Sequence, residues 1–497
     1  MHYMRTWMTM AALAMLLMAR AAMAQRLAVT ETPLGSLGSL ETVKSAVSSP
    51  DARHLALVQK TGRSWRVIVD GKSGPQFDWI LADSLRFSPN GSRVGYIVQT
   101  GQHMVAVIDG QAGRPYDGIE GHAIAFSANG THAAYRGSRA GQGQVMVLDG
   151  VEQDTFDTVD EPLFSADGKR LAYRATDKRG QRVVVDGVEL PLFEQVGRRL
   201  VFSPDGQRIA YAAMREGKWR VVVDAREREA FDEVLDATIT FSADGQKLAY
   251  AAKRGGQWIA MQDGQAGKGY DWISVTDFAF SADGKFLAYA ASLAGKELVV
   301  LAGVELRQYD ALVPRTLQFA PNSRRIAYAA RTKGRVVVVV DGAQGRQYDR
   351  LADGSLRFSQ DSKRYMYAAS AGRQWTVVID GKEQPGSDLV DSAIFGGDGQ
   401  RTIYRARREG MTRVVVDGAE QRAYEEVSPP VFSPDGKHYA YAARDLGQMR
   451  LVVNGMESEQ RWDGVVAGSS LAFGAEGTLR ALMVRGSECL RVEVKAP

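Results

Sequence analysis

Several features are scarce or missing in this sequence of 497 residues. Cys489 is the only cysteine, so an internal disulfide is excluded. A chain of this size does not need one, because a large domain can bury enough apolar surface. No apolar run of spanning length follows residue 24, and no helical periodicity is visible there. The sequence therefore excludes a disulfide framework and favours a β-rich domain without a second membrane span.

Motifs that carry chemistry are also missing. There is no Gly-x-Ser-x-Gly elbow, phosphate-binding loop or dinucleotide fingerprint, and no acidic loop with calcium spacing. The histidines do not stand at metal-ligand spacing on one element. The formal charge of +4 is far below a nucleic-acid-binding footprint. We therefore predict no catalytic residue, no metal, no cofactor and no nucleic-acid partner.

The first two dozen residues have the pattern of a secretory signal peptide. A start containing Arg5 precedes the apolar run Met8–Ala19, and Ala22–Ala24 supply small residues before Gln25. We predict that residues 1–24 are removed and that the protein is periplasmic or secreted. Cleavage also removes Arg20, which with Arg5 lowers the formal charge by two.

One phrase recurs through the rest of the chain. It is clearest at Phe202-Ser203-Pro204-Asp205-Gly206, followed by Ala210-Tyr211, then Val221–Asp224, then Phe231-Asp232. Its phenylalanine returns at steps of 37 to 41 residues, after a degraded first copy at Ser48. The positions are Phe87, Phe126, Phe164, Phe202, Phe241, Phe280, Phe319, Phe358, Phe395, Phe432 and Phe473. Twelve copies of about 39 residues fill the chain after the signal.

Each copy predicts four β-strands. Alternating apolar residues lead to a Pro-Asp-Gly turn, an Ala-Tyr strand, a β-branched strand and an Asp-Gly turn before the last strand. A sheet this small is marginal alone, whereas radial stacking buries both of its faces. We therefore predict an all-β β-propeller with twelve four-stranded blades.

The number of rings is a separate question. Twelve blades exceed the usual four to eight per ring, which favours two six-bladed propellers over residues 25–272 and 273–497. The alternative is one large closed ring. The last copy stops after its third strand, and a spare stretch, Leu27–Glu41, precedes the first copy, so the N-terminal stretch is expected to complete a blade.

Two repeated features are predicted to be structural. The phenylalanine is expected to plug the core between blades, so that Phe202→Ala costs about 3–5 kcal/mol. The Asp of each aromatic-Asp pair, such as Phe231-Asp232, is expected to accept hydrogen bonds from nearby backbone amides.

The phrase at Phe202–Gly206 with Ala210-Tyr211 resembles the WD40-like propeller repeat of the TolB type, and Phe432–Gly436 with Ala440-Tyr441 matches equally well. The resemblance covers nearly all of the chain after the signal. It implies a periplasmic or extracellular module that binds proteins or envelope components. TolB itself resembles a small α/β domain followed by a single propeller, whereas the repeats here begin directly after the predicted signal, so we do not expect the protein to be TolB.

What varies between copies is the expected binding site. We predict that the residues before the inner strands and the basic loops between second and third strands share one face. Acids with a cationic rim would suit an anionic or mixed-charge partner. The candidate residues are His122, Asp160, Glu161, Arg198, Arg199, Asp277 and Arg315.

These observations favour a secreted, non-catalytic propeller that binds a protein or cell-envelope partner through its loop face. One alternative is a hydrolase or lyase with a site at a propeller mouth. Another is a lectin-like propeller that binds glycans, with Trp79, Trp272 and Trp462 as its aromatic platforms. The oligomeric state is left open.

Overall fold

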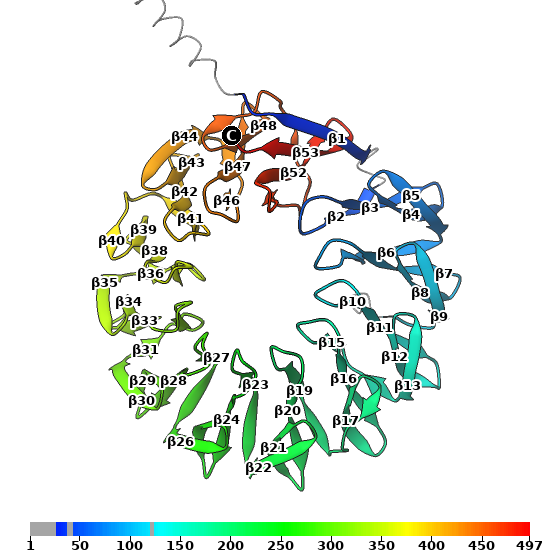
Figure 1. Cartoon of the computed structure of the whole chain (residues 1–497), viewed down its shortest axis with the longest axis vertical. Helices are drawn as coiled ribbons and strands as arrows, with labels where there is room; N and C mark the ends of the chain where they lie inside the picture. Colours follow the sequence, from blue (N-terminus) through cyan, green and yellow to red (C-terminus); the bar gives the residue numbers. More distant parts are fainter. Residues whose placement is uncertain (1–25, 37–42, 120–123) are drawn as a thin grey trace, which may run out of the picture.

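The computed structural model describes residues 26–36, 43–119 and 124–497, and within them every regular element is a β-strand. These strands form twelve antiparallel sheets arranged as the blades of one ring (Figure 1). We number the blades in chain order, from the sheet β2–β5 as blade 1 to the sheet of β50–β53 and β1 as blade 12. The predicted signal peptide, residues 1–24, lies outside the described residues.

The first strand of each blade faces the inside of the ring (Figure 1). In five blades it is divided into two short parts. The first strands are β2 (Val43–Ser48), β6 (Trp79–Phe87), β10 (Ala125–Phe126), β14 (Thr158–Val159) with β15 (Leu163–Phe164), β19 (Gln195–Phe202), β23 (Glu233–Phe241), β27 (Trp272–Phe280), β31 (Ala311–Leu312) with β32 (Gln318–Phe319), β36 (Arg350–Leu351) with β37 (Arg357–Phe358), β41 (Leu389–Phe395), β45 (Glu426–Val427) with β46 (Val431–Phe432), and β50 (Gly464–Val465) with β51 (Ala472–Phe473).

The second strands are almost fully buried, because small Ala residues beside Tyr allow neighbouring blades to approach closely. In blade 5, Ala210 to Ala213 are all solvent-inaccessible. The second strands are β3 (Leu55–Thr61), β7 (Val94–Thr100), β11 (Ala133–Arg139), β16 (Leu171–Asp177), β20 (Ile209–Arg215), β24 (Leu248–Arg254), β28 (Leu287–Leu293), β33 (Ile326–Thr332), β38 (Tyr365–Ala371), β42 (Thr402–Arg408), β47 (Tyr439–Asp445) and β52 (Thr478–Arg485).

The third strands are β-branched and buried on both faces, as Val221 to Val223 show. Most end in an Asp-Gly turn: at Asp109 (φ 52°) and Gly110 (φ 79°) both residues are left-handed, which Asp and Gly tolerate best. The third strands are β4 (Ser64–Val69), β8 (His103–Ile108), β12 (Gly143–Leu148), β17 (Gly180–Val185), β21 (Lys218–Val223), β25 (Gln257–Gln262), β29 (Lys296–Leu301), β34 (Arg335–Val340), β39 (Gln374–Ile379), β43 (Met411–Val416), β48 (Gln448–Val453) and β53 (Glu488–Lys495).

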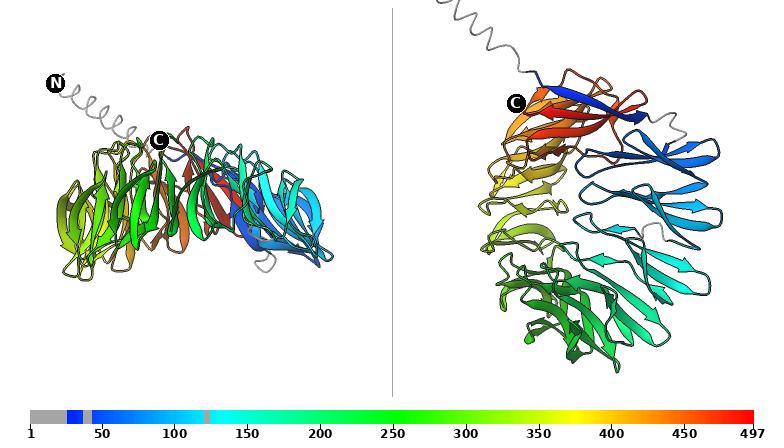
Figure 2. Two further views of the ribbon diagram at one scale, coloured as in Figure 1. Left: turned by 90° about the horizontal axis from the view of Figure 1, so that it is seen from below. Right: turned by 45° about the vertical axis from the view of Figure 1, so that its right-hand side comes forward.

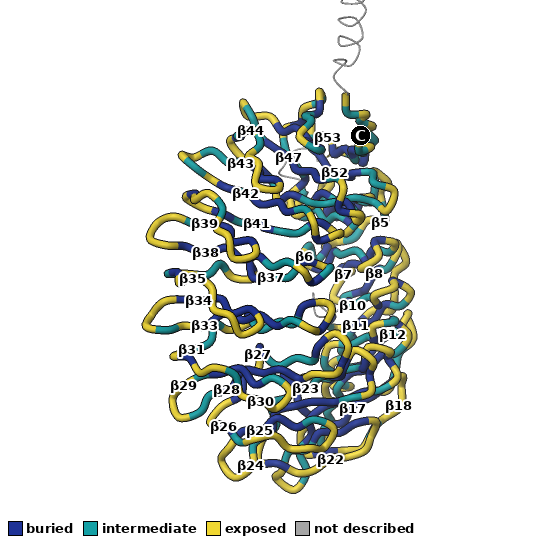
Figure 3. Tube along the Cα trace, turned by 60° about the vertical axis from the view of Figure 1, so that its left-hand side comes forward, coloured by how far each residue is buried: buried dark blue, intermediate teal, exposed yellow. Residues whose placement is uncertain are grey.

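The fourth strands form the exposed outer edge (Figures 1 and 3). Where a fourth strand ends in an aromatic residue, that residue usually turns inward, as Phe231 does with an exposed fraction of 2%. The fourth strands are β5 (Lys72–Phe77), β9 (Gln111–Tyr116), β13 (Val151–Phe156), β18 (Val188–Glu189), β22 (Arg226–Phe231), β26 (Gln265–Tyr270), β30 (Val304–Tyr309), β35 (Ala343–Tyr348), β40 (Lys382–Glu383), β44 (Ala419–Tyr424), β49 (Met456–Glu457) and β1 (Val29–Ser36).

The predicted role of the aromatic-Asp pairs is confirmed. Asp232 accepts a hydrogen bond from the amide of Gly255 at 2.9 Å, and Asp271 accepts one from Ala294 at 2.8 Å. In both cases the donor lies in the turn between the second and third strands of the next blade. The carboxylate thus anchors that turn.

The structure has one ring, so the expectation of two six-bladed rings is corrected to its alternative. Blades 6 and 7 pack like any other neighbours: Trp258 and Tyr270 share a buried cluster with Ile273 and Tyr289. The two tyrosine rings meet edge to face at 6.1 Å. A buried cluster of this kind lies between every pair of adjacent blades, so the proposed seam after residue 272 does not separate two rings.

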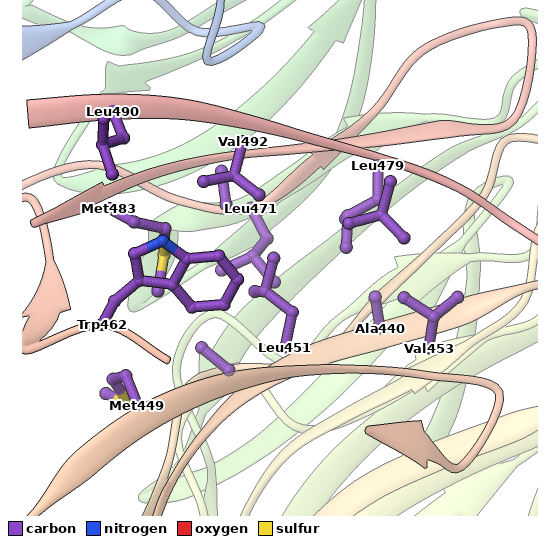
Figure 4. Close-up of a cluster of buried hydrophobic side chains, with 13 residues drawn as sticks. Ala440, Met449, Leu451, Val453, Trp462, Leu471, Leu479, Met483, Leu490 and Val492 are labelled. Carbon is purple, nitrogen blue, oxygen red and sulfur yellow. The ribbon is translucent and has the colours of Figure 1, made fainter. Parts of the chain in front are cut away.

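The N-terminal stretch completes a blade as predicted, and that blade is blade 12. Strand β1 pairs antiparallel with β53, from Val29–Val494 to Ser36–Glu488, and both lie together at the closure (Figure 2). Trp462 is buried among Leu479 and Val492 between blades 11 and 12 (Figure 4).

The only cysteine lies at this closure. Cys489 packs in the cluster between blades 12 and 1, with Leu34 of β1 and Leu55 of blade 1. Burial raises the pKa of its thiol to about 11. The cysteine is thus a packed strand residue in an apolar environment.

The repeated phenylalanine is not the central plug. Phe202 is only half-buried at the edge of the cluster between blades 4 and 5, whereas Tyr211 lies within the cluster and is solvent-inaccessible. The phenylalanine stands at the end of the first strand, beside the turn, where packing is incomplete on one side. The expected cost of Phe202→Ala is therefore below 3–5 kcal/mol, the range for fully buried phenylalanines.

An arginine clamp ties many neighbouring blades together. Arg170 of blade 4 bonds Asp186 of its own blade at 2.8 Å and the carbonyl of Gln207 in blade 5 at 2.8 Å. Its guanidinium also lies 5.4 Å from the ring centre of Phe202. The arginines in this position that also reach a carbonyl of the next blade are Arg93, Arg170, Arg208, Arg325, Arg364 and Arg401.

Candidate binding site on the inner wall

The residues expected in loops before the inner strands lie instead in the middle of those strands. In blade 6, β23 pairs with β24 at Glu233–Leu235 and again from Thr240, with an irregular segment between them. This segment contains Asp236. The correction arises because the residues just after the aromatic-Asp pair already form strand pairs, which moves the variable residues onto the inner wall of the ring.

A hydroxyl usually satisfies the backbone at this interruption. Thr238 donates to the carbonyl of Leu235 at 2.6 Å and accepts the amide of Ala251 from the second strand at 2.8 Å. Ser or Thr does the same in blades 2, 8 and 9. The hydroxyl replaces the partner that the interrupted strand cannot supply.

In blades 4, 5 and 11 an arginine from the preceding blade donates to a carbonyl one residue earlier in the first strand. These carbonyls belong to Val159, Val196 and Val427, which pair with the second residue after the repeated tyrosine, whereas Leu235 pairs with the first. The Arg136 guanidinium donates to the carbonyl of Val159 at 3.0 Å, and the Arg174 guanidinium donates to the carbonyl of Val196 at 2.8 Å. The Arg405 guanidinium donates to the carbonyl of Val427.

Sequence reasoning placed Arg136 and Arg405 in basic loops and did not single out Arg174. All three lie in the middle of second strands, directly after the repeated tyrosine. The sequence contained a signal, because six of the twelve copies have Ala at that position and only these three have Arg.

A cavity of about 420 Å³, open to solvent, lies on the inner wall where blades 4 to 6 meet. Its volume falls within the range of small-ligand pockets. Apolar side chains line part of it and charged groups the remainder. The lining residues are Asp160, Glu161, Pro162, Leu163, Arg174, Arg198, Arg199, Leu200, Asp236 and Ala237.

Most charges in this cavity are left without an ionic partner. Arg174 forms an ion pair with Asp160, and its side chain is only 19% exposed. Arg198 and Arg199 are exposed and form no ion pair within the described chain. Both residues are nevertheless hydrogen-bonded to blade 6: the Arg198 amide donates to Asp236 at 2.9 Å, and the Arg199 guanidinium donates to the carbonyl of Ala237.

Four of the predicted site residues are therefore brought together here, namely Asp160, Glu161, Arg198 and Arg199. Asp277 and Arg315 also meet, but at another position on the wall, between blades 7 and 8.

Asp277 is 4% exposed and accepts the amides of Arg315 at 2.9 Å, Thr316 at 3.1 Å and Leu317 at 3.0 Å. Its carboxylate is occupied by the fold. The side chain of Arg315 is exposed and has no ion-pair partner among the described residues. His122 lies outside the described residues.

The three tryptophans proposed as glycan platforms differ in exposure. Trp79 and Trp272 are 47% and 43% exposed, whereas Trp462 is 1% exposed and belongs to the core. Trp79 packs edge to face on Trp65 at 4.6 Å.

No group of three or more His, Cys, Asp or Glu side chains is placed to hold a metal ion within the described ranges. No helix in that part of the chain is long and apolar enough to cross a membrane.

Comparisons with known proteins give weak likenesses. No protein-family model and no curated protein matches the sequence. A crystal structure of the eukaryotic initiation factor is 14% identical and covers 78% of this chain and 96% of its own, with a TM-score of 0.37. TolB from Acinetobacter baumannii is 15% identical over 51% of this chain and 80% of its own, with a TM-score of 0.24. The Dos1 propeller is 10% identical over 75% and 91%, with a TM-score of 0.28. Function must therefore be argued from the residues of this chain.

Proposed function

We propose that the protein is a secreted, non-catalytic propeller scaffold that binds a protein or cell-envelope partner at the inner wall of blades 4 to 6. The cavity there carries the proposal, because it presents exposed charges that the fold itself does not pair. Charges left free on a rigid wall favour encounter with a partner of complementary charge.

The binding surface is tested by charge reversal. Arg198→Glu/Arg199→Glu should weaken capture of the partner from an envelope extract about tenfold or more, because it turns two attractive contacts into repulsive ones. Arg315→Glu is the matched control, since it reverses one exposed arginine on the same wall outside the cavity. Each captured protein is identified by mass spectrometry after crosslinking at Leu200.

Equal capture by the double variant and the wild type would remove the cavity from the binding surface. Equal losses in the double variant and in Arg315→Glu would indicate general electrostatic attraction instead. Turnover of an ester, lactone, peptide or glycan by the purified protein would overturn the non-catalytic assignment.

Secretion is tested separately. The predicted signal peptide leads us to expect a mature chain that begins at Gln25 in the periplasmic or extracellular fraction. Intact mass of the expressed protein checks this, and a chain that keeps residues 1–24 in the cytoplasm would contradict it.

A further inference from the structure

The inner-wall cavity differs from the cavity between blades 9 and 10 in how its charges are used. The cavity between blades 9 and 10 is also lined by Arg and Asp, but Arg364 pairs with Asp380 at 2.8 Å and Asp417 pairs with Arg401 at 3.0 Å. Those charges hold blades together. In the inner-wall cavity only Asp160 and Arg174 are paired in this way.

The charges of the cavity that form no ion pair among the described residues have both signs. Glu161 belongs to blade 4, Arg198 and Arg199 to blade 5, and Asp236 to blade 6. Opposite charges in one cavity would gain Coulomb energy by meeting, yet none of these four forms an ion pair within the described residues. Hydrogen bonds from the Arg198 amide and the Arg199 guanidinium to blade 6 hold the cationic segment against that blade.

We propose that this cavity binds a short zwitterionic peptide, with a free carboxylate at Arg198 and Arg199 and a free ammonium at Glu161. A guanidinium is a planar donor that matches a carboxylate, and a carboxylate accepts the N–H groups of an ammonium. Pro162, Leu163 and Leu200 give the cavity an apolar side that can contact an aliphatic side chain. This inference rests on the proposed function and adds the chemistry of the partner.

A simple anion fits less well. It would satisfy the two arginines but would leave the Glu161 carboxylate facing a like charge inside the same cavity. A zwitterion pairs with both signs and adds no net charge.

The test uses trialanine and the mature full-length protein in isothermal titration calorimetry. Trialanine should bind, while N-acetyl-trialanine and trialanine amide should each bind about tenfold or more weakly, because each lacks one charged contact. Arg315→Glu should bind trialanine as the wild type does.

Two variants assign the two ends of the peptide through coupled cycles. In Glu161→Gln, N-acetylation of the peptide should no longer matter, whereas amidation still should. In Arg198→Ala/Arg199→Ala, amidation should no longer matter. Both exchanges replace exposed side chains, and thermal melting checks that the variants stay folded.

The zwitterion proposal falls if trialanine does not bind, or if N-acetyl-trialanine binds as well as trialanine, which would mark an anion site only. Neither outcome contradicts the proposed function, because that function is tested by the loss of partner capture in Arg198→Glu/Arg199→Glu. If Arg198→Glu/Arg199→Glu loses partner capture but the wild type does not bind trialanine, the scaffold function is supported and the peptide ligand is excluded.

Discussion

Blades 4 and 5 are joined by an arginine clamp that blades 7 and 8 lack. At the first junction, Arg170 links Asp186 to a carbonyl of the next blade and covers Phe202. At the second, Phe286 and Ala302 occupy the corresponding positions. Yet both junctions have a closed apolar cluster centred on a buried tyrosine. The apolar core is thus common to all junctions, and the clamp is an optional addition at the rim.

The difference also changes the surface. Without the clamp, Phe286 is 42% exposed at the position that Arg170 has in blade 4. Repeat units therefore keep their buried positions alike and differ in what they present at the rim, as expected when each unit contacts only its neighbours.

The largest expected effect comes from the buried tyrosines and shows whether the apolar cores of clamped and unclamped junctions contribute equally to stability. Tyr211→Ala and Tyr328→Ala should each cost about 3–5 kcal/mol, because both remove a fully buried aromatic ring. Phe202→Ala is the half-buried control and should cost less. The urea unfolding midpoint gives the loss of stability in each of the three variants. A small loss in Tyr328→Ala together with a large loss in Tyr211→Ala would show that the cores of the two junctions differ as well.

A smaller effect is expected at the clamp itself. Arg170→Ala should cost about 1 kcal/mol, since its contacts are partly exposed. Phe286→Arg with Ala302→Asp should install a clamp in blade 7 and recover a similar amount, because Ala302 already has the left-handed φ of 50° that Asp tolerates. Thermal melting compares the variants, with Lys247→Ala of blade 6 as the neutral control. No gain from the double exchange would mean that the clamp needs more than these two residues.

The smallest effect concerns the turn beside the clamp. The Ser203 hydroxyl, followed by the Gln207 amide, lowers the pKa of Asp205, whereas blade 8 has the uncharged Asn322 at that place. A carboxyl with a lowered folded pKa adds stability above its unfolded pKa near 4, and this is lost as the pH falls through the folded value. The stability difference between wild type and Asp205→Asn should therefore shrink as the pH falls below about 4. A difference that stays constant over that range would exclude this contribution.

The fold was largely predictable, because each copy carries its own turn and strand signals. Phe202–Gly206 and Ala210-Tyr211 specify a hairpin, and Val221–Asp224 specify a buried strand and its turn. The number of blades in a ring was not predictable in this way. It depends on the small rotation between neighbouring blades, and the junction at Trp258 and Ile273 carries no signal that distinguishes it from the others.

The site was partly predictable. Asp160, Glu161, Arg198 and Arg199 stand out because they depart from the repeat, and the structure places them in one cavity. Arg174 was missed because a cation after a tyrosine reads as a loop residue, whereas its role depends on a carbonyl in the next blade.

Because β1 pairs with β53, closure of the ring depends on the order in which the chain is synthesised. Glu31 and Val492 pair although they lie near opposite ends of the chain. Strand β1 is synthesised first and therefore has no partner along this edge until β53 has been synthesised. Loop closure over such a separation is slow compared with the local hairpins of each blade. We expect a growing chain to pass through an open arc of finished blades, and the circle to form in a single late event.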